Sequence, residues 1–236
     1  MATGSYAEAR LIPAHRLVKV PDGIELKIAA AMMLKGMTTQ YLLRRTYRVE
    51  AGDTILFHAA AGGVGLIACQ WASSLGATVI GTVGSDEKAE LAKANGCHHT
   101  IVYTRENFTE RVREITDGKG VRAVYDAVGK DTWDGSIDCL APLGMMVSFG
   151  NASGPVDPIS PLILSQKGSL FLTRPTLMTY TAERQDLVDT VNDLFDVVGD
   201  GRVKIDVRQT YPLADAAQAH RDLEGRKTTG STVMMV

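Results

Sequence analysis

The residues with the clearest chemical meaning form the glycine-rich segment Ala60-Ala61-Gly62-Gly63-Val64-Gly65. An apolar, β-branched run at 54–60 leads into this segment, and an apolar stripe at helical spacing follows it at 67–75. A strand–loop–helix turn of this kind directs backbone N–H groups and the positive end of the helix dipole at one point, which suits a pyrophosphate. Gly62 would let the backbone approach the phosphates, and Gly65 would let the helix pack closely on the strand. Because alanine replaces the first glycine of the usual fingerprint, a glycine cluster that serves packing alone is the alternative.

The end of the second apolar run bears on which dinucleotide binds. Sites for NAD usually carry Asp or Glu about 20 residues past the glycines, where the carboxylate holds the ribose 2′-hydroxyl. Here that cofactor-binding position is Gly84, followed by Ser85 and, one helical turn further, Lys88. A missing anion and an added cation suit a 2′-phosphate, so the sequence favours NADPH over NADH. The alternative is that Ser85 only caps a helix and that Lys88 is solvated, and the acidic neighbours Asp86 and Glu87 count against NADPH.

Short apolar runs recur at a regular interval through the middle of the chain. Strands that alternate with helices at such an interval indicate βαβ units with right-handed crossovers. We therefore predict an α/β fold, a Rossmann-type doubly wound six-stranded parallel sheet with helices on both faces. The runs begin 22 to 24 residues apart, at Thr54, Thr78, Thr100, Ala123, Met145 and Ser169.

Other elements flank this repeating block. Residues 22–45 are predicted to form a helix broken at Gly36, and the apolar spacing over 187–198 predicts an amphipathic helix. The chain ends, 4–20 and 205–236, are interpreted as β-rich pieces of a second domain. The last elements are expected at 204–210 (strand), 214–224 (helix) and 231–236 (strand).

Composition excludes several classes of protein. Of 236 residues, 45% are apolar and 22% charged, which is typical of a globular chain rather than a disordered one. The net charge of −2 gives no electrostatic reason to expect a nucleic-acid or membrane partner. No secretory signal or membrane span is evident, and three scattered cysteines fit a reducing compartment, so we expect a cytoplasmic protein.

The triplet Cys97-His98-His99 is a candidate metal site. No second ligand pair stands at a plausible spacing, so we expect no metal there. His58, inside a predicted buried strand, is expected to be a hydrogen-bonded core residue.

Five segments carry a recognisable family pattern: GMTTQYLL (36–43), FHAAAGGVGLIACQWA (57–72), VYDAVGKDTW (124–133), VSFGNASG (147–154) and LTRPTL (172–177). Together they resemble the zinc-independent NADPH:quinone oxidoreductases, relatives of zeta-crystallin in the medium-chain dehydrogenase/reductase superfamily. The resemblance covers nearly the whole chain from about residue 4. In zinc-dependent relatives a cysteine ligand would lie near Gly36, and no cysteine occurs there.

This resemblance implies a set of contacts with NADPH. Tyr103 and Phe149 have a simpler alternative as core aromatics, and Arg226 as a solvated surface residue. The implied contacts are the nicotinamide ribose and pyrophosphate for Thr38, Ala61, Gly62, Gly63 and Val64, the 2′-phosphate for Ser85, Lys88 and Tyr103, the nicotinamide half for Phe149, Gly150 and Asn151, and the phosphates for Arg226.

The resemblance also implies an activity and a domain organisation. The activity is hydride transfer from NADPH to a quinone or similar conjugated carbonyl, for which no residue of this chain stands out as a catalytic group. Residues 1–21 would be the remnant of a GroES-like catalytic domain, 22–204 the NADPH-binding Rossmann domain, and 205–236 a segment returning to the catalytic domain. The alternative is a truncated domain that binds NADPH without turnover. Family members commonly pair their last strand across a two-fold axis, so a homodimer through residues 169–175 is expected.

Overall fold

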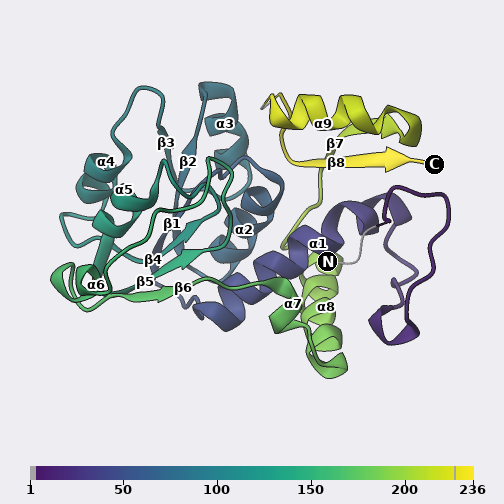
Figure 1. Cartoon of the computed structure of the whole chain (residues 1–236), viewed down its shortest axis with the longest axis horizontal. Helices are drawn as coiled ribbons and strands as arrows, with labels where there is room; N and C mark the ends of the chain where they lie inside the picture. Colours follow the sequence, from purple (N-terminus) through teal and green to yellow (C-terminus); the bar gives the residue numbers. More distant parts are fainter. Residues whose placement is uncertain (1–3, 226) are drawn as a thin grey trace.

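A six-stranded parallel sheet dominates the computed structural model, which describes residues 4–225 and 227–236 (Figure 1). The strand order is β3-β2-β1-β4-β5-β6, and every neighbouring pair runs parallel. The chain thus builds outward from β1 to β3, crosses back to β4 and builds outward again to β6. This topology confirms the predicted Rossmann-type sheet. The strands are β1 Thr54–Phe57, β2 Thr78–Val83, β3 His99–Val102, β4 Val121–Asp126, β5 Leu140–Ser148 and β6 Phe171–Thr173.

Alternate residues along the strands supply two apolar cores, one on each face of the sheet. Phe57 and Tyr125 belong to one core, while Leu56 and Val124 belong to the other, as the two-residue period of a strand requires. Helices α1, α2, α3 and α8 pack on the first core, and α4, α5 and α6 pack on the second (Figure 1). The helices are α1 Leu26–Tyr41, α2 Gly63–Ser74, α3 Asp86–Ala94, α4 Phe108–Ile115, α5 Trp133–Asp138, α6 Leu162–Gln166, α7 Leu177–Tyr180 and α8 Arg184–Gly199.

Helix α1 runs through Gly36 without interruption, so the predicted break there is wrong. Gly36 instead allows α1 and α8 to approach each other closely. A Cβ at this position would lie 2.5 and 2.6 Å from the terminal methyl carbons of Leu194 on α8. A glycine inside a helical pattern therefore marks close helix packing here, and the chain leaves α1 only at a π-helical turn, Leu42–Thr46.

Strand β6 forms one edge of the sheet. It is shorter than the apolar run that predicted it, because Ser169 has a φ of 56°, a left-handed conformation that a strand does not use. Phe171 and Leu172 on this edge are 56% and 39% exposed. An apolar edge strand of this kind is able to pair with another chain, and the homodimer through residues 169–175 stays a prediction.

The C-terminal residues form a small separate layer beside α1. Strands β7 (Val207–Pro212) and β8 (Ser231–Met235) pair in parallel, and α9 (Ala216–Glu224), after a short 3-10 turn at Leu213–Asp215, lies alongside them (Figure 1). The Ser231 hydroxyl donates to the Ala31 carbonyl of α1 at 3.4 Å, which ties this layer to the main body.

The segment from residue 4 to residue 25 contains one short 3-10 turn, Ala14–Arg16, and no strand. The predicted β-rich character of residues 4–20 is therefore wrong, because no described strand pairs with this segment. It is held instead by Arg184 of α8, whose Nη1 donates to the carbonyls of His15 and Leu17 at 3.1 and 2.6 Å.

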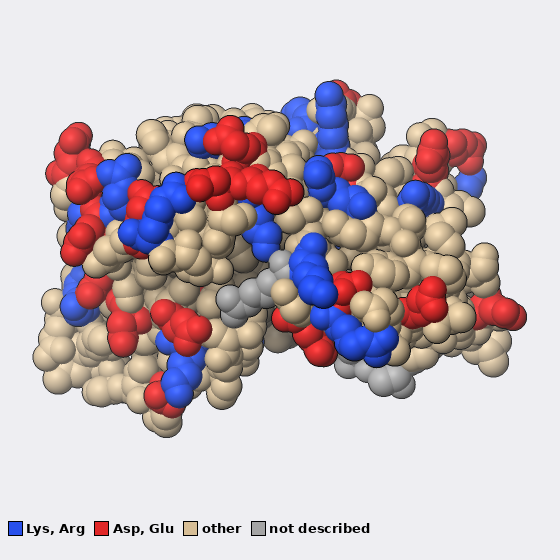
Figure 2. All heavy atoms as spheres, turned by 90° about the horizontal axis from the view of Figure 1, so that it is seen from above, with Lys and Arg blue, Asp and Glu red and all other residues tan. Residues whose placement is uncertain are grey.

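Charged side chains of both signs lie close together on one face of the molecule (Figure 2). On the face shown in Figure 2, Lys and Arg side chains alternate with Asp and Glu. Exposed ion pairs such as Arg105 with Asp86 and Lys93 with Glu90 contribute to this pattern. Within residues 4–225 and 227–236, no helix has both the length and the apolar character needed to cross a bilayer.

Candidate functional site

The glycine segment forms the tight turn between β1 and α2. Gly62 is the N-cap of α2, and its N–H donates to the Ala59 carbonyl at 2.9 Å. A Cβ on Gly65 would lie 2.5 Å from the carbonyl oxygen of Ala59 and 2.6 Å from that of Ala60, far inside van der Waals contact. Only glycine at position 65 therefore lets α2 begin this close to the end of β1, as the sequence predicts.

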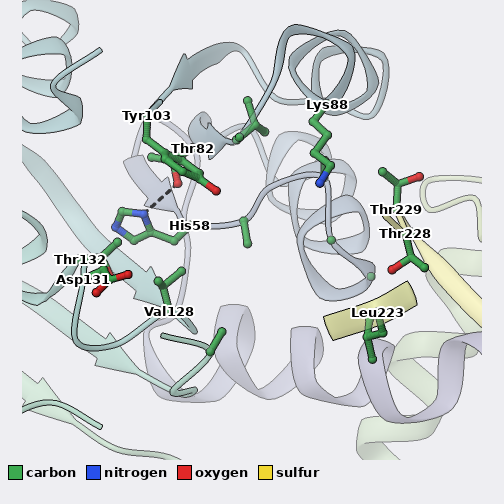
Figure 3. A pocket seen from close by; sticks show the side chains of 18 of the residues that line it. His58, Thr82, Lys88, Tyr103, Val128, Asp131, Thr132, Leu223, Thr228 and Thr229 are labelled. Carbon is green, nitrogen blue, oxygen red and sulfur yellow. Dashed lines mark hydrogen bonds between the residues drawn. The ribbon is translucent and has the colours of Figure 1, made fainter. Parts of the chain in front are cut away.

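The beginning of α2 offers backbone N–H groups to a ligand. The first N–H groups of a helix have no acceptor within it, and the helix dipole adds positive potential at the same point. Ala61, Gly62 and Gly63 line a cavity of about 650 Å³, so this end of the helix borders open space (Figure 3). That volume lies within the range of cofactor sites, and the arrangement fits a diphosphate.

Residues 228–230 form a wall of the cavity that the sequence interpretation missed. Gly230 donates its N–H to the Ala61 carbonyl at 3.2 Å and forms a parallel bridge with Gly62. Thr228 and Thr229 lie next to Leu223 in Figure 3, across the cavity from His58. The one sequence signal near this wall was the predicted phosphate contact of Arg226, which lies outside the described residues.

Of the residues predicted to surround the 2′-phosphate, Lys88 and Tyr103 line the same cavity, and so does Gly84, the predicted cofactor-binding position without a carboxylate. Tyr103 is 44% exposed, so it is a wall of the cavity and not a core aromatic. A Cβ at Gly84 would lie 2.8 Å from the Tyr103 hydroxyl oxygen, so a larger side chain at position 84 would collide with Tyr103. Lys88 extends from α3 into the cavity (Figure 3). This region therefore combines a cation with the lack of a carboxylate at position 84.

The acidic residue closest in sequence to Gly84 has its own counter-charge. Both carboxylate oxygens of Asp86 accept from the Arg105 guanidinium, at 2.5 and 2.7 Å. These hydrogen bonds hold the pKa of Asp86 below its usual value and offset its charge. Ser85 does not line the cavity; its hydroxyl accepts the Lys88 N–H at 3.3 Å and caps α3.

The remaining predicted contacts lie outside the residues that line the cavity. The Thr38 hydroxyl donates to the Leu34 carbonyl at 2.8 Å, within α1. Phe149 packs against the core, with its ring centroid 5.9 Å from that of Phe57. Their proposed roles toward the nicotinamide half stay predictions. The residues in this group are Thr38, Val64, Phe149, Gly150 and Asn151.

Opposite residues 228–230, the cavity is bounded by two walls, one at the ends of β1 and β2 and one in the loop after β4. The first wall includes His58 and Thr82 and the second includes Val128, Asp131 and Thr132, and Figure 3 shows these side chains grouped around the His58 ring. None of these residues was singled out as ligand-binding from the sequence. A usable signal did exist, because open parallel sheets bind ligands at the carboxyl ends of their strands.

In the Cys97-His98-His99 triplet, the side chains of Cys97 and His98 have local backbone partners. The Cys97 thiol donates to the His99 carbonyl at 3.1 Å, and His98 Nδ1 accepts the Val79 N–H at 3.0 Å. No group of three or more His, Cys, Asp or Glu side chains is arranged to hold a metal ion anywhere in residues 4–225 and 227–236.

The doubly wound sheet and the glycine turn at its centre define a Rossmann-type dinucleotide-binding protein. Residues 63–200 match the zinc-binding dehydrogenase family. Over 232 residues the chain is 55% identical to the quinone oxidoreductase of Pseudomonas aeruginosa. The aligned region covers 98% of this chain and 71% of that protein. The chain belongs to the quinone oxidoreductase family of the medium-chain dehydrogenase/reductase superfamily.

Two further relatives refine this comparison. The crystal structure of Escherichia coli quinone oxidoreductase complexed with NADPH has a TM-score of 0.97 and 50% identity, covering all of this chain and 73% of that one. A 2-haloacrylate reductase from a Burkholderia species is 51% identical over 235 residues, covering 98% of this chain and 71% of that protein. The chain therefore spans somewhat less than three quarters of the length of these relatives.

Proposed function

We propose that the chain binds NADPH in the cavity at the start of α2 and takes part in the reduction of a quinone or similar conjugated carbonyl. The observation that carries the proposal is the glycine turn, in which only glycine at position 65 lets α2 begin this close to β1, and which opens on a cavity that Lys88 also lines. The E. coli relative, 50% identical, was solved with NADPH. When bound, NADPH supplies a hydride for the two-electron reduction, and water supplies the accompanying proton.

The residues of the chain would bind and orient this cofactor. The N–H groups at the start of α2 bind the diphosphate, and Lys88 with Tyr103 surrounds the 2′-phosphate. Thr38, Phe149 and Asn151 would lie along the nicotinamide half, as the family resemblance implies. Correct placement of the reacting atoms is the main protein contribution to such a reaction.

We further propose that the reaction needs no zinc. Support comes from Cys97 and His98, whose side chains are engaged with carbonyl and N–H groups of the backbone. Activity should survive prolonged dialysis against a metal chelator, and loss of activity that added zinc restores would refute this part of the proposal.

The test of the main proposal is a titration of the chain with NADPH, followed by addition of a benzoquinone. The fluorescence of NADPH should change on binding, and its absorbance should then fall as the quinone is reduced. No change of fluorescence at any concentration would refute NADPH binding by this cavity.

A second candidate is that the chain alone binds NADPH without turnover. It is favoured by the length of the match, which reaches 71% of the Pseudomonas aeruginosa relative. A fluorescence change with steady absorbance in the presence of quinone would support this candidate over turnover.

The proposal includes an assembly and a domain organisation. The exposed Phe171 on edge strand β6 supports a homodimer that pairs the two β6 edges. The separate β7–β8 layer supports the assignment of residues 205–236 to a second, catalytic domain. In this proposal residues 1–21 are the remnant of that domain and residues 22–204 are the cofactor domain. Free, buried cysteines support a cytoplasmic location.

A further inference from the structure

A buried polar network joins two walls of the cavity through the imidazole of His58. The ring is 1% exposed at the end of β1, and both of its nitrogens have partners. Nδ1 lies 2.9 Å from the Thr82 hydroxyl oxygen on β2 (Figure 3). Nε2 lies 2.9 Å from the Ser136 hydroxyl oxygen on α5. His58 thus spans the space between the end of β2 and the elements that follow β4.

The network continues from Ser136 into the loop after β4. Ser136 donates its hydroxyl proton to Asp126 Oδ2 at 2.9 Å, and Thr132 donates to the same oxygen at 2.7 Å. The other oxygen, Asp126 Oδ1, accepts the N–H groups of Val128 and Gly129 at 2.7 and 3.0 Å. Val128 and Thr132 line the cavity, so Asp126 fixes the backbone and a side chain of that wall.

The direction of each hydrogen bond follows from the number of protons available. Ser136 has one hydroxyl proton and donates it to Asp126, so its oxygen must accept from His58. His58 therefore carries its proton on Nε2, and the bare Nδ1 accepts the Thr82 hydroxyl proton. Burial lowers the pKa of His58, which keeps the ring neutral and compatible with this arrangement.

We propose that His58 is a positioning residue for the cofactor site: as the Nε2–H tautomer it holds the end of β2 and the β4–α5 loop at the separation that the adenosine half of the dinucleotide requires. This inference rests on the proposed NADPH function. Thr82 is followed by Val83 and Gly84 of the cavity wall, and Asp126 is followed by Val128 and Thr132 of the opposite wall. A ligand placed between the two walls gains from their fixed spacing, because less ordering is needed when it binds.

Three substitutions at position 58 separate the two links. His58→Asn places an amide near the Nδ1 position and can keep the link to Thr82, while His58→Gln reaches the Nε2 position and can keep the link to Ser136. His58→Phe fills the site but removes both the acceptor of the Thr82 hydroxyl proton and the N–H that the Ser136 oxygen accepts. We expect NADPH to bind about ten- to a hundred-fold more weakly to the Phe variant, with the Asn and Gln variants in between.

The binding of NADPH fragments distinguishes positioning from a general loss of stability. Adenosine 2′,5′-bisphosphate should lose affinity by the same factor as NADPH, whereas reduced nicotinamide mononucleotide should be unaffected. Val191→Ala, at a buried position of α8 outside the cavity lining, provides a control with lowered stability and an intact network. Equal affinities of wild type and His58→Phe for NADPH would overturn the inference, and so would equal weakening of both fragments. Failure of the wild type itself to bind NADPH would instead refute the proposed function.

The tautomer is tested separately by nitrogen NMR of the imidazole. Wild type should show a protonated Nε2 and a bare Nδ1. Asp126→Asn places an amide N–H group toward Ser136, so Ser136 should then donate to His58 and the ring proton should move to Nδ1. A wild-type spectrum with the proton on Nδ1 would contradict the assigned network.

Discussion

Gly65 offers the sharpest test of how the glycine turn works. The substitution Gly65→Ala adds a Cβ 2.5 Å from the Ala59 carbonyl oxygen and 2.6 Å from that of Ala60. Ordinary contact begins near 3.4 Å, so the start of α2 must move away from β1 by roughly 0.5–1 Å, because the opposing atoms are backbone. Overpacking of this kind costs about 1–3 kcal/mol of folding free energy.

The same displacement should weaken NADPH binding. Hydrogen bonds from the first N–H groups of α2 to a charged diphosphate contribute about 1.5–3 kcal/mol each, so loss of one corresponds to a dissociation constant about 10–100-fold higher. NADPH fluorescence titration measures the constant, and thermal unfolding measures the stability of each variant.

Gly199→Ala is the matched control, because no atom lies within 4 Å of a Cβ at that position and its φ is ordinary. It should leave the dissociation constant unchanged. An unchanged dissociation constant for Gly65→Ala, in a folded variant, would refute the assignment of the turn as the diphosphate site.

Three further predictions follow from other contacts. Lys88→Ala should weaken the binding of NADPH about 10–100-fold and that of NADH less than about twofold, as measured by titration with each cofactor. Lys93→Ala on the same helix should change neither affinity, and equal weakening of NADPH and NADH binding by Lys88→Ala would contradict a contact between Lys88 and the 2′-phosphate. Phe171→Glu should convert a dimer into a monomer in analytical ultracentrifugation, because it places a charge on the exposed edge β6; a wild-type chain that sediments as a monomer would contradict the dimer. Burial lowers the pKa of His58 below its ordinary 6.5. Below about pH 6.5 the His58 ring therefore binds a proton in the unfolded chain while it stays neutral in the folded chain, down to the folded pKa. The stability due to neutral His58 is therefore complete above about pH 6.5 and falls by about 1.4 kcal/mol per pH unit below it, down to the folded pKa. Urea unfolding at pH 7.5 and 5.5 should show this loss in wild type and a smaller one in His58→Phe; identical pH dependence would contradict it.

The parts of the fold that were predictable depend on local sequence patterns. The spacing of apolar runs predicted all six strands of the main sheet, because each βαβ unit needs a similar length of chain. The glycine turn was also predictable from the local sequence, because its strand, loop and helix follow one another directly along the chain.

Features that depend on distant contacts were not predictable in the same way. Gly36 looked like a helix break because the close approach of Leu194 cannot be read from the local sequence. The wall at 228–230 pairs with a turn more than 160 residues earlier, through the bridge between Gly62 and Gly230. His58 was expected to be a hydrogen-bonded core residue, which is confirmed, but its place beside the cavity depends on partners from β2 and α5.

A crystal structure of the chain with NADP⁺ tests the central claim most directly. The diphosphate should lie against the N–H groups at the start of α2, which begin at Gly63, and the 2′-phosphate should lie beside Lys88 and Tyr103. A diphosphate bound away from the start of α2, or a 2′-phosphate pointing away from Lys88 into solvent, would contradict it.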